Sequence, residues 1–216
     1  MSHFKLFVVG ENIEDLLDPF DENDQVEFYD CSEEIAEKWA TYQTEKPDEY
    51  KDIDDFAENY YGYRKEDGVY GYWRNPQAKW DWWVVGGRYD NYLINKHGAS
   101  GDSFQVKDID WEAMERRNAE NAAQWWEEAH QEKNAAMKGF LYGITEGMTK
   151  EQYIAQRTGV SAYAFLVGDQ WVERGEMGWF GMASNEKDAE QWETEMTKFL
   201  KGLEPEQYLT VVDCHI

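Results

Sequence analysis

The sequence predicts an α+β fold with a ferredoxin-like βαββαβ core on an antiparallel sheet, and a large α/β insertion in the first crossover. Segments rich in aromatic and β-branched residues stand near both ends of the chain, at 3–9 and 208–215, and are typical of strands. The last third also predicts a strand at 162–167, a tight turn, a second strand at 170–174 and a helix at 187–200. This order is the one expected of a ferredoxin-like sandwich, in which the first and last strands are antiparallel neighbours.

The remaining elements follow from local patterns along the chain. Ser32 is a good N-cap for a helix over about 33–44, and a second short helix over 52–60 carries its apolar side chains on one face. Asp108 is expected to cap a long amphipathic helix, and Asn185 is expected to cap the last helix. The other predicted strands and helices are 26–29, 69–73, 80–85, 88–94, 110–133 and 149–157.

We expect the 216 residues to form a single domain. Its core would consist of the strands and helix in 3–9 and 160–216, with the insertion at about 25–158. Aromatic residues make up 16% of the chain, which supplies enough large apolar side chains for a packed core despite 31% charged residues.

The chain is strongly acidic, with a formal net charge of −24, and residues 1–60 alone hold 19 acidic and 4 basic residues. Such a surface repels phosphates and argues against binding of duplex DNA. The sequence has no apolar run long enough for a membrane span and no signal-peptide pattern at its start, and Cys31 and Cys214 lie far apart. We therefore expect a cytoplasmic protein without a membrane partner.

The segment 71–89 departs from this acidity, because it holds more basic than acidic side chains and four of the 11 tryptophans. Flat indole rings stack on nucleobases, and guanidinium or ammonium groups hold phosphates. The simpler alternative is that Trp82 and Trp83 are core residues of a strand and that Gly86-Gly87 is a turn. The candidate ligand-binding residues are Arg74, Lys79, Trp80, Trp82 and Arg88.

Polar residues from the two ends of the chain meet if the first and last strands pair with His3 opposite His215. Lys5 then lies opposite Asp213 on the same face, because strand side chains alternate. Two neighbouring imidazoles could act as general acid and base on a phosphodiester, Lys5 could stabilise charge on the phosphoryl oxygens, and Asp213 could hold a histidine tautomer or Lys5.

Two alternatives compete with this catalytic interpretation of His3, His215, Lys5 and Asp213. Frayed ends or a one-residue slip in register would separate the set. A metal ion could instead bind His3, His215 and Asp213, although no short-range ligand motif supports this. The chain also lacks the nucleotide-binding, metalloprotease and serine-hydrolase motifs. We therefore predict no metal and no cofactor, and any enzyme would be a metal-independent phosphodiesterase using a histidine pair.

Several segments together resemble a family of uncharacterised proteins from tailed bacteriophages and bacteria. The similarity lies in the opening Met1-Ser2-His3-Phe4, in Lys79-Trp80-Asp81-Trp82 followed by Gly86-Gly87-Arg88, and in the closing Val212-Asp213-Cys214-His215-Ile216. It leaves 108–158 largely unmatched. The resemblance implies a virus-encoded accessory protein in the host cytoplasm, a class that often blocks host defence.

The sequence is compatible with two functions. The first is an anti-defence protein that binds, and could cleave at a phosphodiester, a nucleotide-derived signalling molecule such as a cyclic nucleotide. The second is a non-enzymatic acidic inhibitor, or DNA mimic, that binds a basic host protein through its negative surface.

Overall fold

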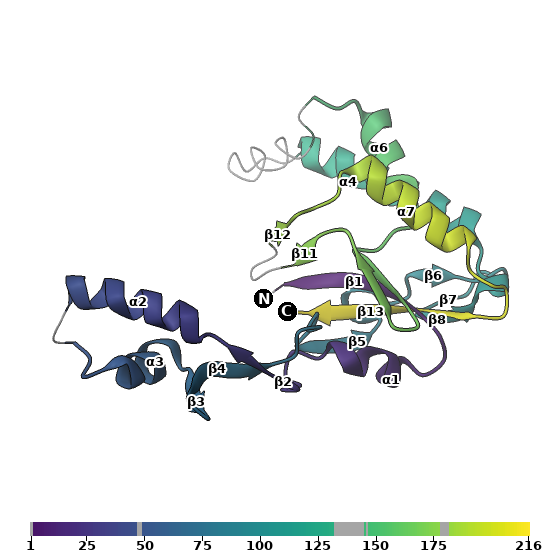
Figure 1. Cartoon of the computed structure of the whole chain (residues 1–216). Coiled ribbons are helices and arrows are strands. Elements are labelled where there is room, and N and C mark those ends of the chain that lie inside the picture. Colours follow the sequence, from purple (N-terminus) through teal and green to yellow (C-terminus); the bar gives the residue numbers. More distant parts are fainter. Residues whose placement is uncertain (1, 47–48, 132–144, 146, 178–181) are drawn as a thin grey trace. The chain divides into compact units, whose positions relative to one another are not determined.

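The computed structural model describes residues 2–46, 49–131, 145, 147–177 and 182–216 (Figure 1). Their contacts divide the chain into two compact units. The first contains Met1–Leu16 and Trp82–Ile216, and the second contains Leu17–Asp81. Whether the two units fold as the single domain that the sequence predicts stays a prediction, because a division by contacts does not measure folding.

The first unit is α+β and is built on a six-stranded sheet with β1 (His3–Val9) and β13 (Tyr208–His215) at its centre. These strands, purple and yellow in Figure 1, lie side by side and antiparallel. His3 is opposite His215 and Lys5 is opposite Asp213, so the predicted register is confirmed. The strand order is β10 (Gln170–Glu173), β9 (Ala164–Val167), β1, β13 and β5 (Trp82–Val85), and β8 (Ser103–Gln105) also pairs with β13.

The prediction of an antiparallel, ferredoxin-like sheet order is wrong in one respect. That order requires β10 beside β1, whereas β9 pairs with β1 in parallel and β10 lies at the edge. A parallel pair needs a long crossover, and the connection from β1 to β9 contains α4 and α6. The expected insertion also contributes β5 and β8 to the main sheet, and is therefore part of the core.

Three helices gather on one side of this sheet, namely α4 (Trp111–Gln131), α6 (Lys150–Thr158) and α7 (Ala189–Lys201) (Figure 1). Phe7 and Val211 from the sheet share a buried core with Met114 of α4 and Met196 of α7. On the opposite face Phe4, Leu6 and Val8 are also buried. Burial on both faces explains why β1 reads as a nearly continuous apolar run.

Four local predictions differ from the structure. Cys31, not Ser32, is the N-cap residue of the helix Ser32–Glu45. Asp110, not Asp108, caps α4, because its carboxylate accepts the backbone N–H of Ala113.

Asp188, not Asn185, caps α7, because its carboxylate accepts the backbone N–H of Gln191. The predicted strand over 88–94 shrinks to β6 (Leu93–Ile94), since the glycines at 86 and 87 have positive φ values of 73° and 57° and turn the chain. The other elements are α1 (Ile13–Leu17), η1 (Asp18–Phe20), η2 (Gly87–Tyr89), β7 (Ser100–Gly101), η3 (Val106–Asp108), β11 (Glu176–Met177) and β12 (Ala183–Ser184).

The second unit pairs a three-stranded sheet with two helices. Its strand order is β2 (Glu27–Asp30), β4 (Val69–Arg74) and β3 (Arg64–Glu66), and its helices are α2 (Ser32–Glu45) and α3 (Ile53–Tyr61). One buried cluster consists of Ile35, Phe56, Ala57 and Tyr70, surrounded by half-buried aromatic rings, and Leu17, Phe20, Cys31 and Trp80 are also buried in this unit. The expected helices over 33–44 and 52–60 are thus confirmed.

Candidate functional site

Three neighbouring strands of the main sheet bring His3, His215 and Trp82 into one row. His3 of β1 lies opposite His215 of β13, which in turn lies opposite Trp82 of β5. Directly opposite residues of paired strands share a face, so the three side chains project to the same side. Two residues further along, Lys5, Asp213 and Val84 form the next row. We call His3, His215 and Trp82 the histidine row.

Asp213 holds His3 in a defined orientation. Nδ1 of His3 lies 2.9 Å from Oδ1 of Asp213, and the two side chains are 14% and 2% exposed. A carboxylate accepts hydrogen bonds, so the proton of a neutral His3 lies on Nδ1 and leaves Nε2 as the basic nitrogen. This is the arrangement in which a carboxylate orients a general base.

A glycine turn closes over the same carboxylate. The backbone N–H of Arg88 donates to Oδ2 of Asp213 at 3.0 Å. A Cβ atom on Gly87 would lie 2.6 Å from both Cβ and Oδ2 of Asp213, and one on Gly86 would lie 2.6 Å from Oδ2 of Asp102. Both glycines are therefore required by close approach to a carboxylate as well as by positive φ. The Gly86-Gly87-Arg88 motif thus positions Asp213.

The rings of the histidine row are close enough to bind one ligand. The centroids of His3 and His215 are 5.0 Å apart at an interplanar angle of 72°, and those of His3 and Trp82 are 6.3 Å apart. Trp82 is 51% exposed, which leaves indole surface open to solvent beside the imidazoles. An exposed indole next to two imidazoles provides a flat surface on which a ligand ring can stack.

The ammonium group of Lys5 is buried beside tyrosine rings, whereas a group that binds phosphate would be open to solvent. Its ammonium nitrogen is 3.5 Å from the centroid of the Tyr92 ring and 5.6 Å from that of Tyr89. Burial lowers the pKa of Lys5, although Tyr92 partly offsets this effect. The sequence did not point to Tyr89 or Tyr92, because both stand in a segment predicted only as a strand.

The predicted ligand-binding residues divide between the two units. Trp82 and Arg88 belong to the first unit, whereas Arg74, Lys79 and Trp80 belong to the second. Trp80 is only 7% exposed and its indole N–H donates to the carbonyl of Leu17, so its surroundings are those of a core residue and not of a stacking platform. The guanidinium of Arg74 lies 3.7 Å from the centroid of the Tyr29 ring. Lys79 is half-buried, and its backbone N–H donates to the carbonyl of Phe20.

The described residues contain neither a candidate metal cluster nor a helix that could span a membrane. No group of three or more histidine, cysteine, aspartate or glutamate side chains is arranged to hold a metal ion there. None of the helices in the described part of the chain is both long and apolar enough to cross a membrane.

Comparisons with known proteins add no family to this description. No protein-family model matches the chain, and neither the curated proteins nor the solved structures yielded a match.

Proposed function

We propose that this protein binds a nucleotide-derived signalling molecule at the histidine row and cleaves it at a phosphodiester bond without a metal ion. The observation that carries the proposal is the buried Asp213, which orients His3 beside His215 and the exposed Trp82. The resemblance noted in the sequence suggests the setting, a bacteriophage protein that removes a defence signal.

The chemistry needs one base and one acid. We assign the base to His3, because Asp213 leaves its Nε2 basic. This imidazole takes a proton from the attacking water as the new P–O bond forms. His215 donates a proton from Nδ1 to the leaving oxygen as the old P–O bond breaks, since its Nε2 is buried. One water molecule is consumed, and general acid–base catalysis of this kind contributes about 10²–10⁴ in rate.

Binding would rely on stacking and charge. The exposed ring of Trp82 would stack on a base, which contributes about 1–3 kcal/mol per base in other proteins. The exposed side chain of Arg88 follows the glycine turn and would contact phosphate. The charge of −24 disfavours long nucleic acids and favours a small ligand.

The test incubates the purified chain with a panel of cyclic di- and trinucleotides. Products and bound ligand are measured by mass spectrometry, both in the ultrafiltrate and after heat denaturation. We expect new product masses with the wild-type chain. The double variant His3→Ala, His215→Ala should keep binding but lose turnover by at least about 10²-fold. Normal turnover by this variant would exclude the histidine mechanism.

A matched pair of tryptophan variants tests the stacking role. Trp82→Ala should weaken binding about ten- to a hundredfold. Trp73→Ala removes an exposed tryptophan of the second unit and should leave binding unchanged.

Ligand that is depleted from the filtrate and recovered intact would support sequestration without cleavage. No depletion with any member of the panel would count against the proposed function.

A further inference from the structure

The second unit contains three sites where a tyrosine ring and a carboxylate together hold one lysine ammonium. Lys38 lies over Tyr61 and pairs with Glu34. The same pattern recurs with Lys46, Tyr42 and Glu49, and with Lys65, Tyr70 and Asp54. We call each tyrosine and carboxylate a tyrosine–carboxylate clamp, formed by Tyr61 with Glu34, Tyr42 with Glu49, and Tyr70 with Asp54.

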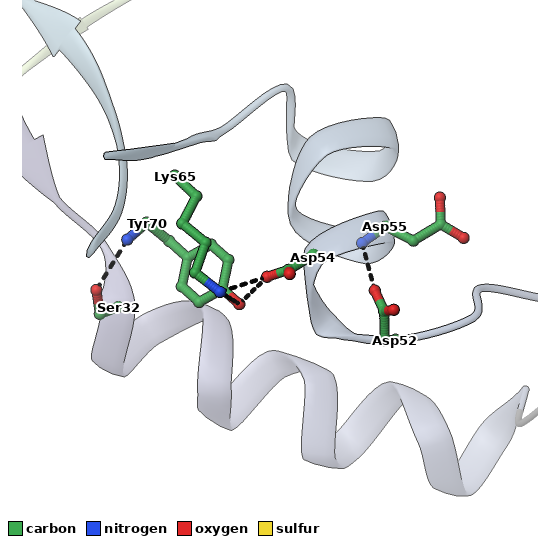
Figure 2. A network of polar contacts seen from close by, with 6 residues as sticks. All are labelled: Ser32, Asp52, Asp54, Asp55, Lys65 and Tyr70. Atoms are coloured by element: carbon green, nitrogen blue, oxygen red, sulfur yellow. Dashed lines mark hydrogen bonds and ion pairs between the residues drawn. The ribbon is translucent and has the colours of Figure 1, made fainter. Parts of the chain in front are cut away.

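Figure 2 shows the clamp that holds Lys65. Its ammonium nitrogen is 2.8 Å from Oδ1 of Asp54, 3.1 Å from the hydroxyl of Tyr70 and 4.7 Å from the centroid of the Tyr70 ring. The Tyr70 hydroxyl donates to the same carboxylate oxygen. Asp54 and then Tyr70 raise the pKa of Lys65 to about 12. Ring, hydroxyl and carboxylate thus act together on one cation.

The other two clamps repeat the ring contact and the ion pair, and one of them also repeats the hydrogen bond from hydroxyl to carboxylate. In the second, Lys46 lies 3.2 Å from Glu49 and 5.6 Å from the centroid of the Tyr42 ring, whose hydroxyl donates to Glu49 at 2.6 Å. In the first, Lys38 lies 4.6 Å from the centroid of the Tyr61 ring. Glu34 raises the pKa of Lys38, and Glu49 raises that of Lys46. Three separate lysines are therefore bound by the same chemistry.

The bound lysines are replaceable. Their side chains are 42–59% exposed, and solvent weakens ion pairs at such exposure. The unit as a whole, Leu17–Asp81, holds 19 acidic and 7 basic residues, which attracts a cationic partner and repels nucleic acid. Further aromatic surface is exposed beside two of the clamps. Tyr60, which contacts Tyr42 and Tyr61, is 54% exposed.

We propose that the clamps bind arginine side chains of an arginine-rich segment in a partner protein, and that Lys38, Lys46 and Lys65 hold the clamps in shape until the partner displaces them. Arginine should bind the clamps more tightly than lysine does. Its planar guanidinium stacks on a tyrosine ring and pairs with a carboxylate through two parallel hydrogen bonds. It is also more weakly hydrated than an ammonium group. The proposal uses no residue of the histidine row and does not depend on the proposed function.

The experiment measures binding of a fluorescent oligoarginine peptide to the full chain by anisotropy, with an oligolysine peptide of equal length as a second probe. One triple variant removes the clamp charges: Glu34→Gln, Glu49→Gln, Asp54→Asn. Its control removes three charges of the same unit that form no ion pair among the described residues: Glu33→Gln, Glu37→Gln, Glu45→Gln. Both triples change the net charge equally, so a difference between them reports the clamps.

We expect the clamp triple to weaken oligoarginine binding at least about tenfold and the control triple less than about threefold. Removing a bound lysine should have the opposite effect: Lys65→Gln should tighten binding more than Lys51→Gln, since the ammonium of Lys51 has neither an ion pair nor a ring contact among the described residues. Circular dichroism checks folding, and the single variant Glu49→Gln, at an exposed pair, replaces the triple if the triple does not fold.

Three results would overturn the proposal. The two triples could weaken binding equally, which would mean a general effect of charge. Oligolysine could bind as tightly as oligoarginine, which would remove the preference for a guanidinium. The wild-type chain could also bind neither peptide.

Discussion

The two units of this chain have different kinds of core. In the first unit, eleven of the described residues form a buried cluster, and the central strands are buried on both faces. In the second unit the buried cluster has four described residues, Ile35, Phe56, Ala57 and Tyr70, and it is surrounded by half-exposed tyrosines with carboxylates and lysines at their edges. A small unit buries a smaller fraction of its surface than a large one. The second unit therefore depends more on ring contacts and polar contacts at its surface.

The difference matches what each unit is proposed to do. A general base must be held in one orientation, and the buried Asp213 does this within a densely packed sheet. A surface that exchanges its own lysines for a partner's arginines needs exposed, weakly held contacts, which the clamps supply.

The largest expected effect comes from deleting one large core side chain in each unit. Phe7→Ala should lower the free energy of unfolding by about 4–5 kcal/mol, because the dense core cannot fill the cavity. Phe56→Ala should cost about 3 kcal/mol, since the half-exposed rings around it can move inward. Hydrogen exchange should show faster exchange in α2 and α3 of Phe56→Ala, with β1 and β13 still protected.

A uniform rise in exchange across both units would contradict this comparison. It would instead support the single cooperative domain predicted from the sequence.

A smaller effect is expected at the glycine turn that supports the histidine row. Gly87→Ala should cost about 2–3 kcal/mol more than Gly168→Ala in denaturant unfolding. Both glycines have positive φ, 57° and 60°, so the backbone strain is matched. A Cβ at position 87 would lie 2.6 Å from Asp213 and 2.7 Å from Cγ1 of Val84, whereas one at 168 has nothing within 4 Å. Equal costs would mean that the turn can relax without disturbing Asp213.

The smallest effect is a pH dependence of opposite sign in the two units. Burial puts the folded-state pKa of Lys5 below its unfolded value of 10.5, so the unfolded chain binds more protons between these two values. The free energy of unfolding should therefore rise with pH through that window, by at most about 1.4 kcal/mol per pH unit. Lys5→Met should abolish this rise.

The clamp lysines should behave in the opposite way. Their folded-state pKa values are raised, so their stabilisation is present below pH 10.5 and is lost as the pH rises toward about 12, the value for Lys65. Hydrogen exchange in α2 and α3 would report this loss. A fall in the stability of the first unit as the pH rises toward 10.5 would contradict the assignment for Lys5.

Part of the candidate site could be predicted from the sequence because it depends on alternation alone. Once the first and last strands pair antiparallel with His3 opposite His215, Asp213 must lie opposite Lys5 on the same face. The place of Trp82 in the row depends on β5 pairing with β13, a contact between distant segments that no local pattern encodes. The burial of Trp80 likewise depends on what packs around it, since Trp80 and Trp82 lie only two residues apart in the same tryptophan-rich segment but are 7% and 51% exposed.

The sequence by itself determined the helices, the main strands, the register of the two chain ends and the acidity of the second unit. Each of these follows from composition or from apolar side chains that recur every two or 3.6 residues, and so depends on neighbouring residues alone. Only the tertiary structure decided that β9 and not β10 lies beside β1, that β5 and β8 complete the sheet, and that three lysines are held over tyrosine rings. These outcomes depend on which distant surfaces bury the most apolar area and pair the most charge, and that competition is settled only when the whole chain packs.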